Sequence, residues 1–276
     1  MAAATVTSYG AFVEPEEWVV DRVQVRLARL PRAFDGFTIA QLSDIHFGPF
    51  LHEGHLQRVV EATNALNADL IALTGDYISM PLLSGQRRRM LATEDARDCA
   101  RIMSGLRSRL GIVAVLGNHD HGYNPALVAR YFENNGIPVL RNRSTSIEAN
   151  GARLWLAGVD DVVKRANDLP RTLRGIPVDE TTVALVHEPD FADVVAAAPH
   201  RVDLQLSGHS HGGQIRFPLL GAPVLPRLAQ EYPWGLRRVR HMQLYTNRGI
   251  GTIVLPVRLD CPPEITLLTL RLGGTV

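Results

Sequence analysis

The sequence has few cysteines, no long apolar run and no excess of either charge. Its two cysteines, Cys99 and Cys261, exclude a disulfide-stabilised scaffold and favour a reducing compartment. No apolar run approaches ~18 residues, so we expect no transmembrane helix. Residues 1–12 also lack the basic start and the apolar core of a signal peptide. We therefore expect a cytoplasmic protein, with peripheral contact at a membrane surface left open.

The charge balance narrows the range of partners. Lys and Arg number 29 against 28 Asp and Glu, so the formal charge is +1. This balance gives no compositional reason to expect a nucleic-acid partner. The 276 residues are 46% hydrophobic and 21% charged, close to globular averages. Because no linker-like stretch divides them, we expect residues 1–276 to form a single domain.

The first half of the chain alternates apolar runs with segments of helical spacing. The predicted strands are 19–30, 37–43, 70–74 and 112–116, and the predicted helices are 55–66, 95–109 and 125–134. This alternation predicts an α/β sheet with parallel neighbours.

The second half is richer in predicted strands. They cover residues 137–140, 145–149, 153–157, 182–186, 203–207, 242–246 and 264–270. Asn150-Gly151 predicts a hairpin turn, a helix is expected after Pro189, and residues 216–238, rich in Pro and Gly, are expected to form a long loop. We expect a second sheet that is formed mainly by this half of the chain.

Metal-ligand residue types follow five of the strands, at the point where each strand ends. The groups are Asp44-Ile45-His46, Gly75-Asp76, Asn118-His119-Asp120, His187 and His209-Ser210-His211. Ligands of open α/β sheets bind beyond the carboxyl ends of the strands, so the groups are expected to converge. Nitrogen and oxygen ligands without sulfur suit manganese, iron or zinc. Two ions about 3.5–4 Å apart form a clamp for displacement at phosphorus, and Asp76 is placed to bridge them.

Each group alone has a plainer explanation. A single histidine at a strand end is more often a core or surface residue, and a lone Gly-Asp pair is usually a turn. Five such groups, each after a buried strand, are hard to obtain as turns. We therefore interpret the whole set as a candidate metal centre.

Taken in order, these motifs resemble those of the calcineurin-like metallophosphoesterase superfamily. The longer strings SDIHFG, TGDY, GNHD and GHSHGGQ, with YTNRGIG and PPEI near the end, are similar to a bacterial phosphodiesterase branch that includes UDP-2,3-diacylglucosamine hydrolases. The resemblance implies a four-layer αββα sandwich of two mixed sheets flanked by helices. It also implies a binuclear centre of divalent transition-metal ions. One ion would be held by Asp44, His46, Asp76 and His211, and the other by Asp76, Asn118, His187 and His209.

The resemblance further implies a metal-dependent phosphoric ester hydrolase, either a phosphodiesterase or a pyrophosphatase. A hydroxide that bridges the metals would attack phosphorus in line. Asn118 and His119 would stabilise the phosphoryl oxygens, and His119 would protonate the leaving oxygen. Asp120 is expected to orient His119 through its other ring nitrogen.

The resemblance suggests a nucleotide-sugar lipid as the substrate, and a smaller diester such as a cyclic nucleotide stays open. Two other functions also stay open. A nuclease of the same superfamily would need a basic groove, which the net charge does not predict. A catalytically silent metal-binding scaffold would usually have lost ligands, whereas this set is complete.

Several further residues could contact the substrate. His121, Tyr123 and Arg248 are candidates, although a solvated surface position also explains each of them. The basic run Arg87-Arg88-Arg89 beside apolar residues 80–83 is compatible with a lid or with the solvated start of a helix.

Overall fold

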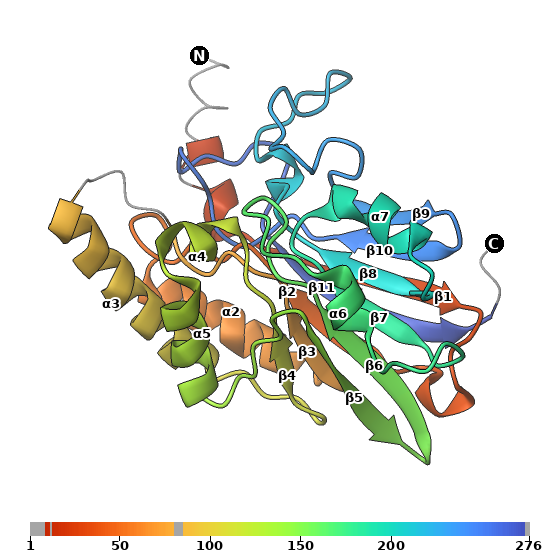
Figure 1. Ribbon diagram of the computed structural model, residues 1–276. Helices are drawn as coiled ribbons and strands as arrows, with labels where there is room; N and C mark the ends of the chain where they lie inside the picture. Colours follow the sequence, from red (N-terminus) through yellow and green to blue (C-terminus); the bar gives the residue numbers. More distant parts are fainter. Residues whose placement is uncertain (1–8, 12, 80–84, 274–276) are drawn as a thin grey trace.

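The computed structural model describes residues 9–11, 13–79 and 85–273 of the chain. Two β-sheets lie face to face in this part of the molecule, with helices on their outer sides (Figure 1). The order of layers confirms the predicted αββα sandwich.

The first sheet has five strands in the order β1, β11, β2, β3 and β4. Their bounds are β1 (Val19–Leu27), β2 (Thr38–Leu42), β3 (Leu70–Leu73), β4 (Ile112–Ala114) and β11 (Glu264–Leu272). β11 is antiparallel to β2, while the other neighbours are parallel. Strands from the two ends of the chain therefore lie side by side.

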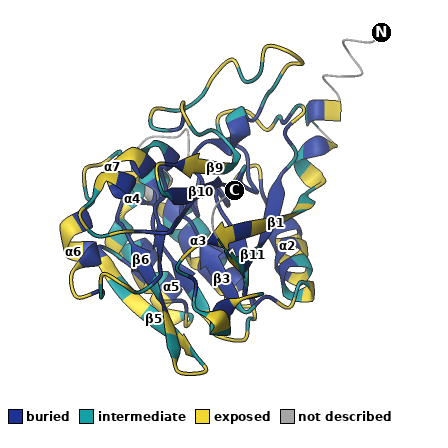
Figure 2. Cartoon of the chain, turned by 90° about the vertical axis from the view of Figure 1, so that its right-hand side faces the viewer, coloured by how far each residue is buried: buried dark blue, intermediate teal, exposed yellow. Residues whose placement is uncertain are grey.

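The second sheet has six strands in the order β5, β6, β7, β8, β10 and β9. Their bounds are β5 (Arg143–Ala149), β6 (Ala152–Gly158), β7 (Thr182–Leu185), β8 (Leu204–Ser207), β9 (Gly235–Val239) and β10 (Met242–Thr246). The central neighbours are parallel, and β5 and β9 run antiparallel at the two edges. The inner strands β7 and β8 are buried along their length. Every residue of the edge strand β5 is at least partly exposed (Figure 2).

Three apolar clusters hold the layers together. Side chains such as Ile39, Leu156 and Leu206 fill the space between the sheets. The outer face of the first sheet is covered by α2 (Glu53–Ala65), α3 (Gly85–Met103) and α5 (Pro125–Asn134). The outer face of the second sheet is covered by α6 (Leu169–Leu173) and α7 (Ala192–Ala197). A further helix is α4 (Asn118–Tyr123). The short 3-10 turns are η1 (Glu14–Glu16), η2 (Arg32–Phe34), η3 (Pro189–Phe191) and η4 (His211–Gly213).

Most predicted strands are present with shifted ends, and the predicted hairpin is confirmed. Asn150 and Gly151 both have positive φ, at 49° and 77°, as a tight turn between antiparallel β5 and β6 requires. The helix expected after Pro189 is confirmed as η3 followed by α7. None of the described helices is long and apolar enough to cross a membrane.

Some expectations from the sequence are wrong. Residues 137–140 form no strand, because only Val139 pairs, in a single bridge with Ala114. The predicted loop 216–238 ends in β9, which pairs with β10. The helix expected over 95–109 is displaced toward the N-terminus, so that α3 begins at Gly85 and includes the basic run. Arg87 is exposed there, whereas residues 80–83 lie outside the described part of the chain.

Candidate metal centre

The five groups of ligand-type residues meet where the parallel strands of both sheets end. Asp44 and His46 follow β2, and Asp76 follows β3. His187 follows β7, and His209 and His211 follow β8 in the other sheet. Backbone hydrogen bonds join these loops: His46 N–H donates to Asp76 O, and Gly208 N–H donates to His187 O. The site therefore lies across the seam between the two sheets.

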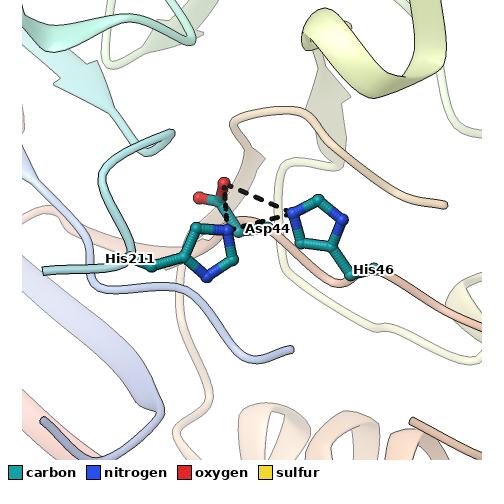
Figure 3. Close-up of side chains that lie close together, drawn as sticks. All are labelled: Asp44, His46 and His211. Atoms are coloured by element: carbon teal, nitrogen blue, oxygen red, sulfur yellow. Dashed lines mark hydrogen bonds and ion pairs between the residues drawn. The ribbon is translucent and has the colours of Figure 1, made fainter. Parts of the chain in front are cut away.

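Three side chains form the first cluster: Asp44, His46 and His211 (Figure 3). The Nε2 atoms of His46 and His211 lie 3.0 Å apart. Asp44 Oδ1 lies 3.4 Å from His211 Nε2 and 3.9 Å from His46 Nε2. All three side chains are buried and point toward a common centre, so together they offer a cation two nitrogens and an oxygen.

Asp76, His187 and His209 form the second cluster. Asp76 also belongs to a group with His46 and His119, so it touches both halves of the site. Its Oδ2 atom lies 3.1 Å from His187 Nε2 and 3.7 Å from His46 Nε2. Its other oxygen, Oδ1, accepts the backbone N–H of His119 at 2.8 Å. One carboxylate oxygen thus faces histidines from the two sheets.

The backbone holds the ligands in an uncommon conformation. Five of them have φ between 47° and 67°: Asp44, His46, Asp76, His209 and His211. Side chains other than glycine enter this left-handed region at a cost, and such residues cluster at functional sites. These left-handed turns lie just after the strand ends and point the candidate ligand side chains toward the site.

Glycines allow the ligand loops to approach each other closely. A Cβ atom at Gly208 would lie 1.8 Å from Ser43 Oγ and 2.3 Å from Asp44 Oδ2. A Cβ atom at Gly117 would lie 2.2 Å from Asp76 Oδ1. The carboxylates of the site therefore occupy the space that a larger residue would need.

Three of the histidines are held neutral by burial. Burial lowers the pKa of His46 to about 3 and that of His209 to about 4, and it holds the pKa of His211 well below its ordinary value. His209 Nε2–H donates to the Arg227 carbonyl at 2.9 Å, which leaves its Nδ1 lone pair free. Neutral imidazoles are the form that binds a metal, so this group of side chains fits a cation.

Asp76 and His187 form a pair of opposite charges within the site. Burial lowers the pKa of His187, but Asp76 and Asp44 outweigh that effect and hold this pKa well above its ordinary value. Burial raises the pKa of Asp76, but His187 and His119 outweigh it and hold this pKa well below its ordinary value. His187 Nδ1–H donates to the Thr74 carbonyl at 2.7 Å, so Nε2 is the ring nitrogen that faces Asp76. A bound cation could replace the proton that this position attracts.

Buried polar atoms without a hydrogen-bond partner test whether the site fits metal ions. Among the described residues, Asn118 Oδ1 is such an atom at the cluster. A buried acceptor that stays unpaired costs free energy, and a cation would satisfy this oxygen. The donor set therefore fits oxygen- and nitrogen-binding divalent ions.

A cavity of about 560 Å³ opens directly onto the cluster. One side of it is polar and is lined by Asp76, Asn118, His119, His209, Ser210 and His211. The other side is apolar and is lined mainly by Ile215, Phe217, Pro223, Val224, Pro226, Ile253, Val254 and Leu255. Ligand pockets commonly combine an apolar lining with a few convergent polar groups, as this one does.

Comparison with known proteins agrees with the geometry of the site. Residues 37–213 match the family described as calcineurin-like phosphoesterase. The chain is 31% identical over 278 residues to the uncharacterized metallophosphoesterase YkuE of Bacillus subtilis, covering 98% of this chain and 93% of the relative. The chain belongs to this family. It is therefore a metal-dependent phosphoric ester hydrolase of a family that uses two metal ions, as the sequence predicted.

Two further relatives differ in length. The chain is 30% identical over 271 residues to phosphodiesterase YaeI of Escherichia coli, covering 97% of this chain and 94% of the relative. It is 31% identical over 282 residues to a transmembrane protein with a metallophosphoesterase domain from Danio rerio. That match covers 97% of this chain but only 61% of the relative, so the chain spans less than two thirds of that longer protein.

The hydrogen-bond partners of Asp120 differ from the partner expected from the sequence. Its carboxylate accepts three backbone N–H groups, those of Asp76, Tyr77 and Gly117, at 2.9–3.0 Å. His119 Nδ1 has no hydrogen-bond partner in the described part of the chain. The expectation that Asp120 orients the His119 ring is therefore wrong. Asp120 instead fastens the Gly117 loop to the Asp76 loop.

The other candidate substrate contacts already have partners within the protein. His121 Nε2 lies 2.6 Å from Asp160 Oδ1, and the Tyr123 hydroxyl contacts the Thr93 hydroxyl. Arg248 donates to Glu264 Oε2 at 2.6 Å and to Asp21 Oδ2 at 2.7 Å. None of these three side chains lines the cavity described above. Their contact with substrate stays a prediction, and these pairings compete with it.

Sequence reasoning missed the apolar wall of the cavity. It comes from two loops, 215–226 and 253–255, neither of which carries a metal-binding motif. The signal was present as apolar residues in the predicted loop 216–238, where solvated polar residues would be expected.

Proposed function

We propose that this chain is a phosphodiesterase that holds two divalent metal ions across the seam between its sheets. The observation that carries the proposal is the position of Asp76 Oδ2, between His187 Nε2 at 3.1 Å and His46 Nε2 at 3.7 Å. A carboxylate shared by two sets of histidines is suited to bridging two cations. The name of the Escherichia coli relative supports a diester as the substrate class.

The proposed ligands divide between two ions. Asp44, His46, Asp76 and His211 would hold one ion, and Asp76, Asn118, His187 and His209 the other. Bound there, the ions would supply Lewis-acid stabilisation and an activated water for attack at phosphorus. Manganese, iron and zinc all suit these nitrogen and oxygen donors.

His119 and Asn118 are the proposed catalytic side chains. Both line the cavity, and the His119 ring packs edge-on against the His46 ring with centroids 4.7 Å apart. His119 is therefore placed beside the ligands with a ring nitrogen available to a substrate. It would hold a proton for the leaving oxygen, while the Asn118 amide would help to stabilise the phosphoryl oxygens. Asp120 would support both residues by fixing their loop.

The apolar wall favours a diester with an apolar substituent, such as a nucleotide-sugar lipid, over a cyclic nucleotide. Among the described residues that line the cavity, histidine is the only basic type, with no Lys or Arg. Nucleases bind phosphate backbones largely through Lys and Arg, so this lining does not favour a nuclease. We therefore propose a small-molecule substrate.

Hydrolysis of two chromogenic esters tests the proposal. Metal-stripped protein is refilled with manganese and assayed with bis-p-nitrophenyl phosphate, a diester, and p-nitrophenyl phosphate, a monoester. We expect diester turnover that needs the metal and exceeds monoester turnover. Faster monoester turnover would overturn the diester assignment. Full metal occupancy without turnover of either ester would favour a silent metal-binding scaffold.

A further inference from the structure

Six large, exposed apolar side chains line the cavity at the candidate metal centre or lie in the turn next to its lining residues. We call this set the apolar rim: Phe217, Leu219, Leu220, Val224, Val254 and Leu255. Leu219 is fully exposed, and Leu220, Val224 and Val254 are 84%, 75% and 73% exposed. Contiguous apolar surface of this kind usually marks an interaction site. The segment that precedes β9 projects beyond the body of the fold in Figure 1 and again in Figure 2.

Hydrogen bonds give the rim a defined shape. Phe217 and Gly221 exchange backbone hydrogen bonds at 2.9 Å in both directions, so Pro218, Leu219 and Leu220 form the tip of a tight turn. The Gln214 side chain donates to the carbonyls of Ile253 and Leu255 and accepts the N–H of Ile253. The two loops therefore present their apolar side chains as one surface.

Two rim residues adopt a backbone conformation that does not suit them. Leu219 has φ of 69° and Val254 has φ of 64°, in the left-handed region where glycine or asparagine fits better. For a β-branched residue such as Val254 this conformation is a marked outlier. Both side chains are also exposed, so burial in this chain does not offset the cost. An apolar partner that covers them would offset it.

The charge around the rim points to the kind of partner. Residues 209–230 and 249–259 contain no Asp or Glu. Arg227 is exposed, and the Arg216 guanidinium lies 3.7 Å above the Trp234 ring. Tryptophan and arginine suit the boundary between water and lipid, because each has an apolar body and a polar end. The absence of carboxylates within these segments lowers the cost of approach to an anionic surface.

We propose that the apolar rim inserts into the surface of a lipid bilayer, so that the metal cavity opens toward the lipid. The rim projects outward, which suits insertion between lipids better than docking into a groove. This inference goes beyond the proposed phosphodiesterase activity, since the rim could bind lipid whether or not the metals turn over a diester.

Sedimentation with vesicles tests the proposal on the full chain. The vesicles contain phosphatidylcholine and phosphatidylglycerol, and the test variant is L219S/L220S, at two positions that do not line the cavity. The matched control is V178S/V194S, which alters two exposed valines outside the rim, one before β7 and one on α7. We expect the control to bind vesicles as the wild type does, and the test variant to lose at least about tenfold in partitioning.

Activity on a soluble diester separates this proposal from the proposed function. Because Leu219 and Leu220 lie outside the cavity, L219S/L220S is expected to hydrolyse bis-p-nitrophenyl phosphate at the wild-type rate. Absence of wild-type binding to vesicles would overturn the membrane proposal and leave the phosphodiesterase assignment intact. Equal binding by all three proteins would also overturn it. Self-association of the wild type without vesicles, lost in L219S/L220S, would assign the rim to a contact between copies of this chain and contradict the proposal.

Discussion

His119 differs from the other histidines of the site in its partners. Its backbone N–H is fixed to Asp76 Oδ1 at 2.8 Å, but its ring is only partly buried and lines the cavity. We propose that Asp76 positions the ring for catalysis and that His119 is not needed to hold an ion, although its ring also lies in a candidate metal group with His46 and Asp76. This separation between holding an ion and acting on a substrate can be tested with single substitutions.

Replacing His119 with alanine should remove catalysis and spare metal binding. We expect kcat for bis-p-nitrophenyl phosphate to fall by about 10²–10⁴-fold, the usual contribution of a general acid. The folded fraction by circular dichroism and the metal content by elemental analysis should match the wild type. If metal were lost in proportion to activity, His119 would have to be counted as a ligand.

Asp76→Asn should reduce metal binding, which His119→Ala is expected to spare. The substitution keeps the size of the side chain but replaces an anionic oxygen with an amide group, at the position that faces His187 and His46. We expect metal content to fall at both positions, because one residue serves both. Elemental analysis after dialysis measures this change, and Asp44→Asn, at a residue of the first cluster alone, is the comparison. Loss of one ion only, equal in the two variants, would contradict the bridging role.

The identities of the candidate ligands could be predicted from the sequence, but several partners could not. Asp44, His46, Asp76, His187, His209 and His211 all follow strands, and the alternating pattern places strand ends at one edge. The partners of Asp120 and Arg248 depend on which backbone groups and carboxylates approach from distant segments. Arg248 meets Asp21 across 227 positions of sequence, a separation that no local pattern encodes.

At the scale of single elements, the loops that follow the strands pack closely against each other. Gly208 links the end of β8 to His209, and its Cα faces Ser43 and Asp44 after β2. The N–H of His209 donates to both oxygens of Asp44, at 3.1 Å and 2.9 Å. Close contact between these two loops thus sets the position of one candidate ligand from each sheet.

Gly208→Ala should disturb this contact. The added Cβ would overlap Ser43 Oγ and Asp44 Oδ2, and overpacking of this kind costs roughly 1–3 kcal/mol. Denaturant unfolding measures the loss of stability, and metal content reports the displacement of Asp44. The control is Gly54→Ala in helix α2, where the nearest atom would be 3.9 Å away. That variant should be unchanged or more stable by up to about 1 kcal/mol. Equal stability of the two variants would contradict the close approach.

Buried strands could be predicted from the sequence although they are short, whereas short helices could not. The strands β2, β3, β7, β8 and β10 are mostly apolar and almost entirely buried, as core strands should be. Helix α4 has six residues and α6 has five, too few for a periodic pattern to appear. Strand β9 has two exposed arginines and forms only by pairing with β10, which is a tertiary effect.

At the scale of the whole molecule, the candidate metal centre lies where the two sheets meet, next to their apolar packing and to hydrogen bonds such as that from Gln41 to the Ser207 carbonyl. Its candidate ligands follow β2 and β3 in one sheet and β7 and β8 in the other. We propose that residues 1–276 form one domain, supported by the pairing of β1 with β11 from opposite ends of the chain. In such an arrangement, a bound metal ion would stabilise the entire fold.

Removal of metal should therefore lower the free energy of unfolding. A ligand that binds only the folded state stabilises it by about 2.7 kcal/mol when present at about one hundred times its dissociation constant. We expect unfolding by urea to shift to lower concentration after chelation and to be restored by manganese. Calcium, which prefers oxygen donors, is the control and should restore little. An unchanged transition would mean that the metals do not link the two sheets.

The central claim is that two metal ions act together on a phosphodiester. The most direct measurement adds manganese stepwise to metal-free protein while turnover of bis-p-nitrophenyl phosphate and bound manganese are followed together. The account predicts that turnover curves upward with added metal and saturates when two ions are bound per chain. A rate that saturates at one ion per chain, or two bound ions without turnover, would contradict it.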